Sequence, residues 1–318
     1  ALIRPLDRPP VPLPPFADGF SLEGGEALVI LGGSNAAELA RFGYFETLLA
    51  ASYPGGALHL RNLAWPADTV YRQQRPRNFF SSENPGYGER DGREPLAVDV
   101  AFLWLGQSEA IDGAETLDAF ELAYREKLDL LQAYTGRVVL VTPVPCEDPL
   151  GLGLDTEKRN RTLASVAATI RQLGKEKGLP VVDLFSRMKG QQVTRDGLLL
   201  SRRGHLLAAQ EIIRTLRRGK PGGILAGETR PDGKLQSQPA EDLRQAVLEK
   251  NRLWQQYWKP TNWAFLYGNR QTQPSSRDHR NNRVRWFPGE LQGLLPLLDE
   301  ADLKIHAAAK AASAPAGS

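Results

Sequence analysis

The chain has very few of the residues from which metal sites and disulfides are built. Its 318 residues include one cysteine, Cys146, and four histidines. A single cysteine excludes an intrachain disulfide. His59, His205, His279 and His306 are scattered along the chain without the spacing of a metal site. We therefore expect no metal and no bound cofactor.

Long apolar runs are missing as well. The longest, at residues 98–106, has the length of a strand, whereas a membrane-spanning helix needs about 20 apolar residues. The 40 Lys and Arg residues nearly balance the 37 Asp and Glu residues, and the net charge of +3 is too small to imply nucleic-acid binding. These properties predict a globular protein that neither spans a membrane nor binds nucleic acid.

The N-terminal segment is rich in proline. Residues 5–15 contain too few N–H donors for a helix or a central strand and favour an extended polyproline conformation. We expect them to lie on the domain surface or to tether a partner. The first residues, Ala-Leu-Ile-Arg-Pro, are compatible with a mature N-terminus left by signal-peptide cleavage, so we expect a periplasmic or otherwise exported protein.

The next part of the chain alternates short apolar runs with segments of helical spacing. Strands are predicted at 27–31, 57–63, 98–105, 137–142 and 180–185, and helices at 35–51, 117–134, 156–177 and 203–217. Strands separated by helices of this length form a parallel sheet with helices on both faces. The fold class is therefore α/β, a flavodoxin-like three-layer α/β/α arrangement around about five parallel strands.

Composition divides the chain into five segments. We expect a Pro-rich arm at 1–24, an α/β domain at 25–220, a linker at 221–239, an aromatic and basic C-terminal extension at 240–306, and a disordered tail at 307–318. Within the extension, the spacing predicts a helix at 242–258 and a shorter one at 291–306.

Polar residues follow several of the predicted strands, at the edge where α/β proteins bind ligands. Ser34 comes directly after the first strand, in Leu-Gly-Gly-Ser-Asn at 31–35. At such a strand-to-helix turn a serine serves either as a nucleophile near helix N–H groups or as a plain helix N-cap. Further segments of this kind are Leu-Gly-Gln-Ser-Glu-Ala at 105–110 and Asp-Gly-Leu-Leu-Leu-Ser at 196–201.

These segments, with the loop at 61–70, resemble in their order the four motifs of the SGNH (GDSL-type) hydrolase superfamily. The resemblance covers residues 25 to 216. The stretch 249–270, with Asn281 and Asn282 after it, is similar to the C-terminal extension of SGNH-like proteins from planctomycetes and verrucomicrobia. The resemblance implies an SGNH hydrolase fold, but fold alone does not carry activity.

Matching the motifs position by position indicates a degenerate site. Ser34 stands at the nucleophile and Asp196 at the triad aspartate, but Leu199 occupies the histidine position. The two oxyanion-hole positions are changed to Ala67, from glycine, and Ser108, from asparagine. Two further positions complete the comparison: Glu109, a retained acid expected to hold the loops of the site together, and Gly33, which replaces the aspartate before the nucleophile.

A serine hydroxyl needs an adjacent base to attack an ester at neutral pH. The only histidine near the motif is His205, six residues past Leu199, and helical spacing places it about a turn and a half from the required position. His205 is therefore a weak candidate for a replacement base. Asp196 has a second interpretation, because Asp-Gly is also a common turn.

The extension mixes aromatic and basic residues. Its candidates for a protein interface are Arg277, Arg280, Arg283, Arg285 and Trp286. The alternative is that the extension wraps around the α/β domain and buries its aromatic side chains there.

Three functions remain open from the sequence. The first is a degenerate hydrolase-like protein that serves as a binding or scaffold subunit of a larger, exported protein assembly. The second is an active esterase or carbohydrate deacetylase in which Ser34 works with a non-standard base. The third is a non-hydrolytic protein that binds carbohydrate in the former active-site cleft.

Overall fold

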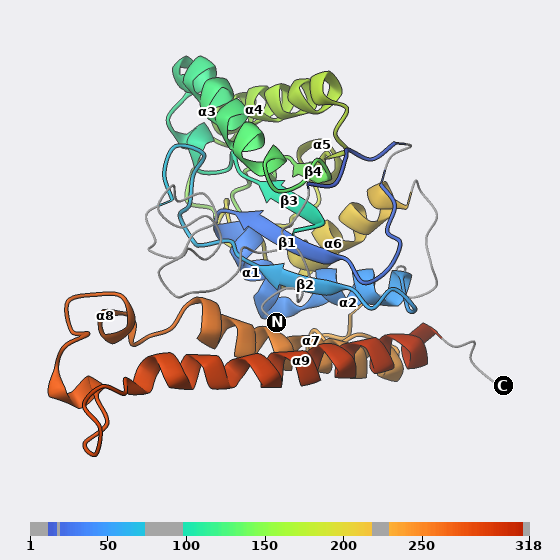
Figure 1. Ribbon diagram of the computed structural model, residues 1–318. Helices are drawn as coiled ribbons and strands as arrows, with labels where there is room; N and C mark the ends of the chain where they lie inside the picture. Colours follow the sequence, from blue (N-terminus) through green and yellow to red (C-terminus); the bar gives the residue numbers. More distant parts are fainter. Residues whose placement is uncertain (1–11, 18–19, 74–97, 218–228, 314–318) are drawn as a thin grey trace.

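The computed structural model describes residues 12–17, 20–73, 98–217 and 229–313. Its centre is a parallel five-stranded sheet with the strand order β2-β1-β3-β4-β5 (Figure 1). The strands are β1 (Ala27–Gly32), β2 (His59–Asn62), β3 (Val100–Trp104), β4 (Val138–Val141) and β5 (Val181–Val182). The predicted α/β class with about five parallel strands is confirmed.

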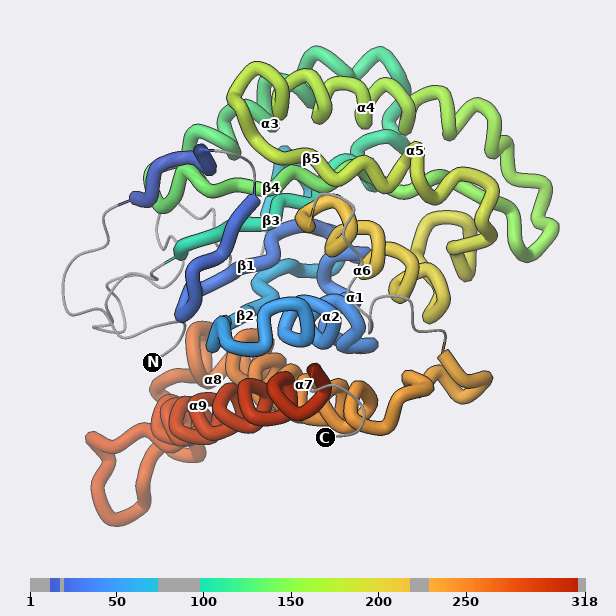
Figure 2. Tube along the Cα trace, turned by 90° about the vertical axis from the view of Figure 1, so that its right-hand side faces the viewer, coloured from blue at the N-terminus to red at the C-terminus, as the bar shows by residue number. Residues whose placement is uncertain are grey.

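Helices cover both faces of the sheet, as Figures 1 and 2 show. One face packs against α3 (Leu117–Gln132) and α4 (Thr156–Lys177). The other packs against α1 (Ser34–Phe42), α2 (Tyr44–Ser52), α5 (Leu184–Met188) and α6 (Arg202–Leu216). Alternate residues along β1 divide between the two cores, with Val29 facing α3 and α4 and Leu28 facing the opposite layer. This division follows from the two-residue period of a strand.

The single helix predicted at 35–51 is wrong, because the structure has two helices there. Gly43 separates α1 from α2 and adopts a left-handed conformation with φ of 71°. A Cβ at this position would lie 3.2 Å from the side chain of Leu248. Glycine is favoured here because it takes this backbone angle without strain and leaves room for the neighbouring helix.

The C-terminal extension forms α7 (Gln238–Trp258), α8 (Trp263–Leu266) and α9 (Trp286–Ser313). α7 and α9 lie side by side and cover the β2 edge of the sheet (Figures 1 and 2). Trp254 and Trp258 are fully buried by this packing, as the wrapping alternative predicts. Trp286, in contrast, is 42% exposed.

The predictions for the end of the chain need correction. α9 begins five residues before the helix expected at 291–306, and residues 307–313 of the predicted disordered tail are its last two turns. Ile305 and Ala309 are buried against α7, which stabilises this end of the helix. Alanine has the highest helix propensity, so the run of alanines at 307–312 supports the helix.

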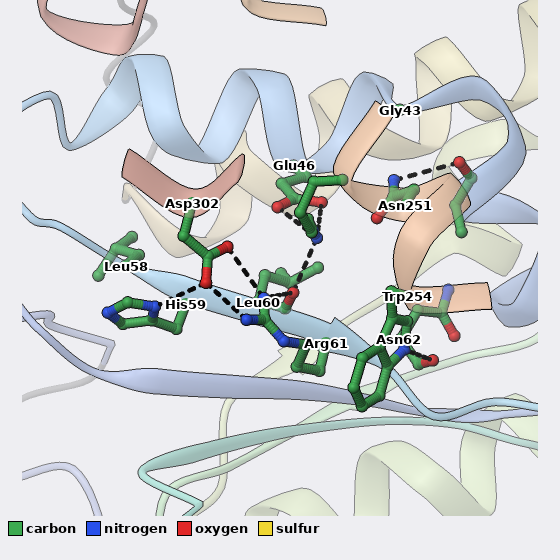
Figure 3. Close-up of polar contacts among 12 residues, drawn as sticks. Gly43, Glu46, Leu58, His59, Leu60, Arg61, Asn62, Asn251, Trp254 and Asp302 are labelled. Carbon is green, nitrogen blue, oxygen red and sulfur yellow. Dashed lines mark hydrogen bonds and ion pairs between the residues drawn. The ribbon is translucent and has the colours of Figure 1, made fainter. Parts of the chain in front are cut away.

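Side chains from the extension hydrogen-bond the carbonyl groups on the outer edge of β2 (Figure 3). Lys250 Nζ donates to the Leu60 carbonyl at 2.9 Å, and Trp254 Nε1 donates to the Asn62 carbonyl at 2.7 Å. His306 Nε2 lies 3.0 Å from the Leu58 carbonyl. These carbonyls belong to alternate residues, which is the pattern of the unpaired side of an edge strand.

Two buried ion pairs lie at the same outer edge of β2 (Figure 3). Arg61 contacts Asp302 of α9 through both guanidinium nitrogens, at 3.0 and 2.5 Å. Burial would raise the pKa of Asp302, but Arg61 and His59 outweigh it and hold this pKa far below its usual value. Lys250 contacts Glu46 of α2 at 2.7 Å, and burial lowers the pKa of Lys250 and raises that of Glu46.

The described part of the Pro-rich arm lies against the α/β domain. The Leu13 carbonyl accepts a hydrogen bond from Gly136 N–H at 2.7 Å, and the ring of Phe20 lies 6.3 Å from that of Phe102 on β3. Residues 1–11 and 18–19 of the arm and residues 221–228 of the linker lie outside the described residues. Of the remaining linker, Thr229 and Leu235 form an antiparallel bridge. Within the described ranges, no helix is long and apolar enough to cross a membrane.

Candidate active site

A pocket of about 260 Å³ opens beyond the carboxyl ends of the central strands. Its lining includes Ser34, Ser108, Glu109, Asp196 and Leu199. The fold therefore brings together residues from all four segments that the sequence singles out, because Asp68 of the loop at 61–70 also lines the pocket. The volume lies just below the roughly 300–1,000 Å³ of typical drug-sized ligand sites, so the pocket suits a small group.

Ser34 is the first residue of α1, and its hydroxyl points to the neighbouring loop. The N-cap of α1 is Gly33, which corrects the interpretation of Ser34 as a plain N-cap. Ser34 Oγ instead accepts a hydrogen bond from Ala67 N–H at 3.1 Å. β1 ends at Gly32, where a Cβ would lie 2.2 Å from the Trp104 carbonyl, so only glycine lets the chain turn this closely beside β3.

Ala67 has a backbone conformation that favours glycine. Its φ is +65°, in the left-handed region. For a residue other than glycine, this conformation costs about 1–2 kcal/mol of conformational free energy. The Ala67 N–H thereby donates to Ser34 Oγ.

Glu109 joins the two loops that form one wall of the pocket. One carboxylate oxygen accepts the Val70 N–H at 2.6 Å, and the other accepts the Gly106 N–H at 3.0 Å. The side chain is nearly fully buried, and burial raises its pKa despite these hydrogen bonds. Ser108, the residue before it, lines the pocket from the same loop.

Asp196 forms the turn that its Asp-Gly sequence predicts and also lines the pocket. Its Oδ1 accepts hydrogen bonds from Leu198 N–H at 3.0 Å and from Leu199 N–H at 2.8 Å. Leu199 also lines the pocket, so an apolar residue lies beside Asp196 there. One carboxylate oxygen of Asp196 is thus used to shape the turn.

Asn35 is a site residue that the sequence analysis missed. Its side-chain amide donates to the Leu198 carbonyl at 3.0 Å and accepts from Leu200 N–H at 2.9 Å. It thereby fastens the Asp196 turn to the start of α1, beside Ser34. Its position next to the candidate nucleophile was the available signal, but nothing in the sequence indicates a partner 163 residues away.

His205 is not a replacement base, which corrects that candidate. It is completely buried on α6, with its ring 4.7 Å from that of Phe42, and it is not among the pocket-lining residues. Its Nε2 lies 3.5 Å from Glu38 Oε2, and burial lowers the pKa of the imidazole. The Glu38 carboxylate also binds the Arg195 guanidinium at 2.7 and 2.8 Å.

None of the other histidines lines the pocket either. His59 and His306 lie at the covered edge of β2, and His279 is largely exposed in the 277–285 hairpin. The sequence has no further histidine, so the residues outside the described ranges supply none. Among the described residues, no cluster of His, Cys, Asp and Glu has the composition of a metal site.

The interface candidates occupy a hairpin between α8 and α9. Arg277 and Arg285 pair across it in an antiparallel bridge, and Arg285 donates to the Phe265 and Leu266 carbonyls at 2.7 and 3.0 Å. These two arginines therefore have structural contacts. Three candidates remain exposed to solvent: Arg280, Arg283 and Trp286.

Comparisons with known proteins agree with this geometry. Residues 30–209 match the model of the GDSL-like lipase/acylhydrolase family. No curated protein sequence matches significantly. Among solved structures, Axe2, an acetylxylan esterase from Geobacillus stearothermophilus, is 18% identical, with 61% of this chain and 95% of Axe2 covered and a TM-score of 0.46.

A second solved structure extends over more of the chain. BT4096, a gut microbial diltiazem-metabolizing enzyme, is 12% identical, with 92% of this chain and 96% of BT4096 covered and a TM-score of 0.60. A coverage this large includes part of the C-terminal extension as well as the α/β domain. The combination of the two parts is therefore shared by another protein.

Proposed function

Because the chain belongs to the GDSL-like lipase/acylhydrolase family, we propose that it is a catalytically degenerate member that retains the pocket as a binding site. In this proposal it serves as a binding or scaffold subunit of a larger, exported protein assembly. One observation carries the loss of hydrolysis: Leu199 lines the pocket beside Asp196, and none of the four histidines does.

The chemistry follows from the missing base. A serine hydroxyl is a weak nucleophile at neutral pH unless a neighbouring group removes its proton. Loss of one triad member typically leaves only the weak rate enhancement that the oxyanion hole and binding provide. The binding parts are retained, since Ala67 N–H reaches Ser34 Oγ and Glu109 holds the adjoining loops. The site is thus arranged to bind a small polar group, without a histidine that could start its cleavage.

The contact between Ala67 N–H and Ser34 Oγ also favours the second candidate, an active esterase in which Ser34 has a non-standard base. Labelling with a fluorophosphonate, read by intact mass, separates the two candidates. The wild type and the variants Ser34→Ala, Leu199→His and Leu199→His/Ser34→Ala form the set. Leu199→His restores a base beside Asp196 and so shows that the probe enters the pocket.

We expect no labelling of the wild type and labelling of Leu199→His that disappears when Ser34 is also replaced. Stoichiometric labelling of the wild type that is lost in Ser34→Ala would overturn the degenerate assignment. If Leu199→His also stays unlabelled, the changes at Ala67 and Ser108 contribute to the loss, and Leu199 alone does not explain it.

The exposed part of the hairpin supports a subunit role. Arg280 and Arg283 present two cations next to the exposed Trp286, a combination enriched at protein interfaces. Affinity purification from the native source should recover a partner with the wild type and lose it with Arg280→Gln/Arg283→Gln. Arg161→Gln, at an exposed arginine on α4, is the matched control. A monomer without a co-purifying partner would contradict the scaffold role.

A further inference from the structure

A second and larger hollow lies in the C-terminal extension, separate from the Ser34 pocket. It measures about 480 Å³ and is formed by the end of α7, the turn at 259–262 and the beginning of α9. Figure 1 shows these segments at the end of the helix pair where α8 lies. The hollow shares no lining residue with the Ser34 pocket, and its volume falls within the range of small-molecule sites. We call it the extension groove.

Four neutral polar side chains line the extension groove. Gln255 and Gln256 at the end of α7, with Thr261 and Asn262 in the turn, contribute three amides and one hydroxyl. Within the described part of the chain, none of these four side chains makes a hydrogen bond. Each amide offers donors and an acceptor side by side, and the hydroxyl is both donor and acceptor. Such a set matches a ligand whose own groups donate and accept, as sugar hydroxyls do.

The rest of the lining supplies an apolar floor with balanced charge. Phe287, Leu291 and Leu294 of α9 form the apolar side. The ring of Phe287 is half-buried and lies 5.0 Å from the ring of Phe265, so the groove has an aromatic wall of fixed position. Lys259 and Glu290 contribute one charge of each sign. The lining therefore favours neither an anion nor a cation.

The backbone that carries this lining is packed. Gln255 and Gln256 lie on a 21-residue helix that is buried through Trp254, Tyr257 and Trp258. Lys259 Nζ lies 4.9 Å from the centre of the Trp65 ring, which belongs to the loop that carries Ala67. A packed backbone lowers the entropy cost of binding, which then falls mainly on exposed side chains such as Gln256 and Thr261.

We propose that the extension groove binds a neutral glycan segment, with the amides and the hydroxyl bonding sugar hydroxyls and Phe287 packing against a ring face. An anionic ligand is disfavoured because the carboxylate of Glu290 offsets the charge of Lys259 in the groove. A folded protein partner would find Lys259 and Glu290 in the contact area, whereas the centres of protein interfaces are depleted of charged residues. The assignment is independent of hydrolysis at Ser34.

Calorimetric titration of the full chain tests the proposal with four probes: cellohexaose, xylohexaose, mannohexaose and hexagalacturonate. Gln255→Ala/Gln256→Ala removes two amides, and alanine keeps the helix favourable. Phe287→Ala removes the aromatic wall. Gln292→Ala changes an exposed glutamine of α9 outside the groove, and Ser34→Ala changes the other pocket. Circular dichroism of every variant shows that it is folded.

We expect at least one neutral hexasaccharide to bind. Its Kd should rise at least about tenfold in Gln255→Ala/Gln256→Ala and in Phe287→Ala, and stay unchanged in Gln292→Ala and Ser34→Ala. No binding of any neutral probe at millimolar concentration overturns the proposal. Preference for hexagalacturonate, or binding that only Ser34→Ala removes, overturns it as well. Because Ser34 labelling is measured separately, failure here leaves the degenerate assignment intact.

Discussion

The Arg61–Asp302 pair permits a quantitative prediction about the attachment of the extension. Arg61 is fully buried, and Asp302 is 3% exposed. In Asp302→Ala the guanidinium loses the carboxylate that it contacts at 3.0 and 2.5 Å, and it keeps the Leu60 carbonyl at 3.1 Å and the Trp254 ring at 5.5 Å. Removing one partner of a buried pair typically costs about 3–5 kcal/mol. Whole domains have only about 5–15 kcal/mol of stability, so the variant should be severely destabilised.

Urea unfolding, followed by tryptophan fluorescence and circular dichroism, measures this loss. Glu300→Ala, at an exposed position of the same helix, should change the free energy of unfolding by less than about 0.5 kcal/mol. Arg61→Met/Asp302→Ala removes both charges and should recover at least half of the loss, because the uncompensated charge is then gone. The reasoning is refuted if Asp302→Ala behaves like Glu300→Ala, or if the double variant is no more stable than Asp302→Ala.

Two further predictions concern carboxylates near the Ser34 pocket. His205 and the Arg195 guanidinium outweigh burial and lower the pKa of Glu38 from 4.5 to about 2. The ionised Glu38 therefore contributes about 3 kcal/mol to the free energy of unfolding above pH 4.5, and this contribution is lost as the pH falls to 2. In thermal melts across this range, the melting temperature of Glu38→Gln should depend less on pH than that of the wild type. Glu109→Gln places an NH₂ group opposite a backbone N–H and should cost about 1–3 kcal/mol in urea unfolding, unlike the exposed Glu115→Gln.

The sheet could be predicted from the sequence because its strands are short apolar runs with helical segments between them. The break at Gly43 could not, because the apolar spacing continues from Phe42 through Phe45 as in one helix. The early start of α9 was hidden by Pro288, Gly289 and Pro296, which discourage a helix prediction. Burial of Leu291 and Leu298 in the core overrides these local preferences.

The pocket shows the same division between local and distant information. The sequence predicts that three of the pocket residues lie in loops at the carboxyl edge of the sheet: Ser34, Ser108 and Asp196. Their proximity therefore follows from the topology. The contacts of Asn35 with the Asp196 turn, and of Arg61 with Asp302, join positions more than 150 residues apart. No local pattern in one sequence encodes such pairs, and only the packed fold reveals them.

The capping of β2 has a consequence for any attempt to shorten the protein. An exposed edge strand is a template for pairing with other chains. Here Lys250, Trp254 and His306 occupy the outward carbonyls of Leu58, Leu60 and Asn62. Cutting the chain before α7 would free these acceptors and remove Asp302 and Lys250, which form ion pairs with Arg61 and Glu46. The helices α7 and α9 thus prevent β2 from pairing with the strands of other molecules. We expect the α/β domain without them to aggregate.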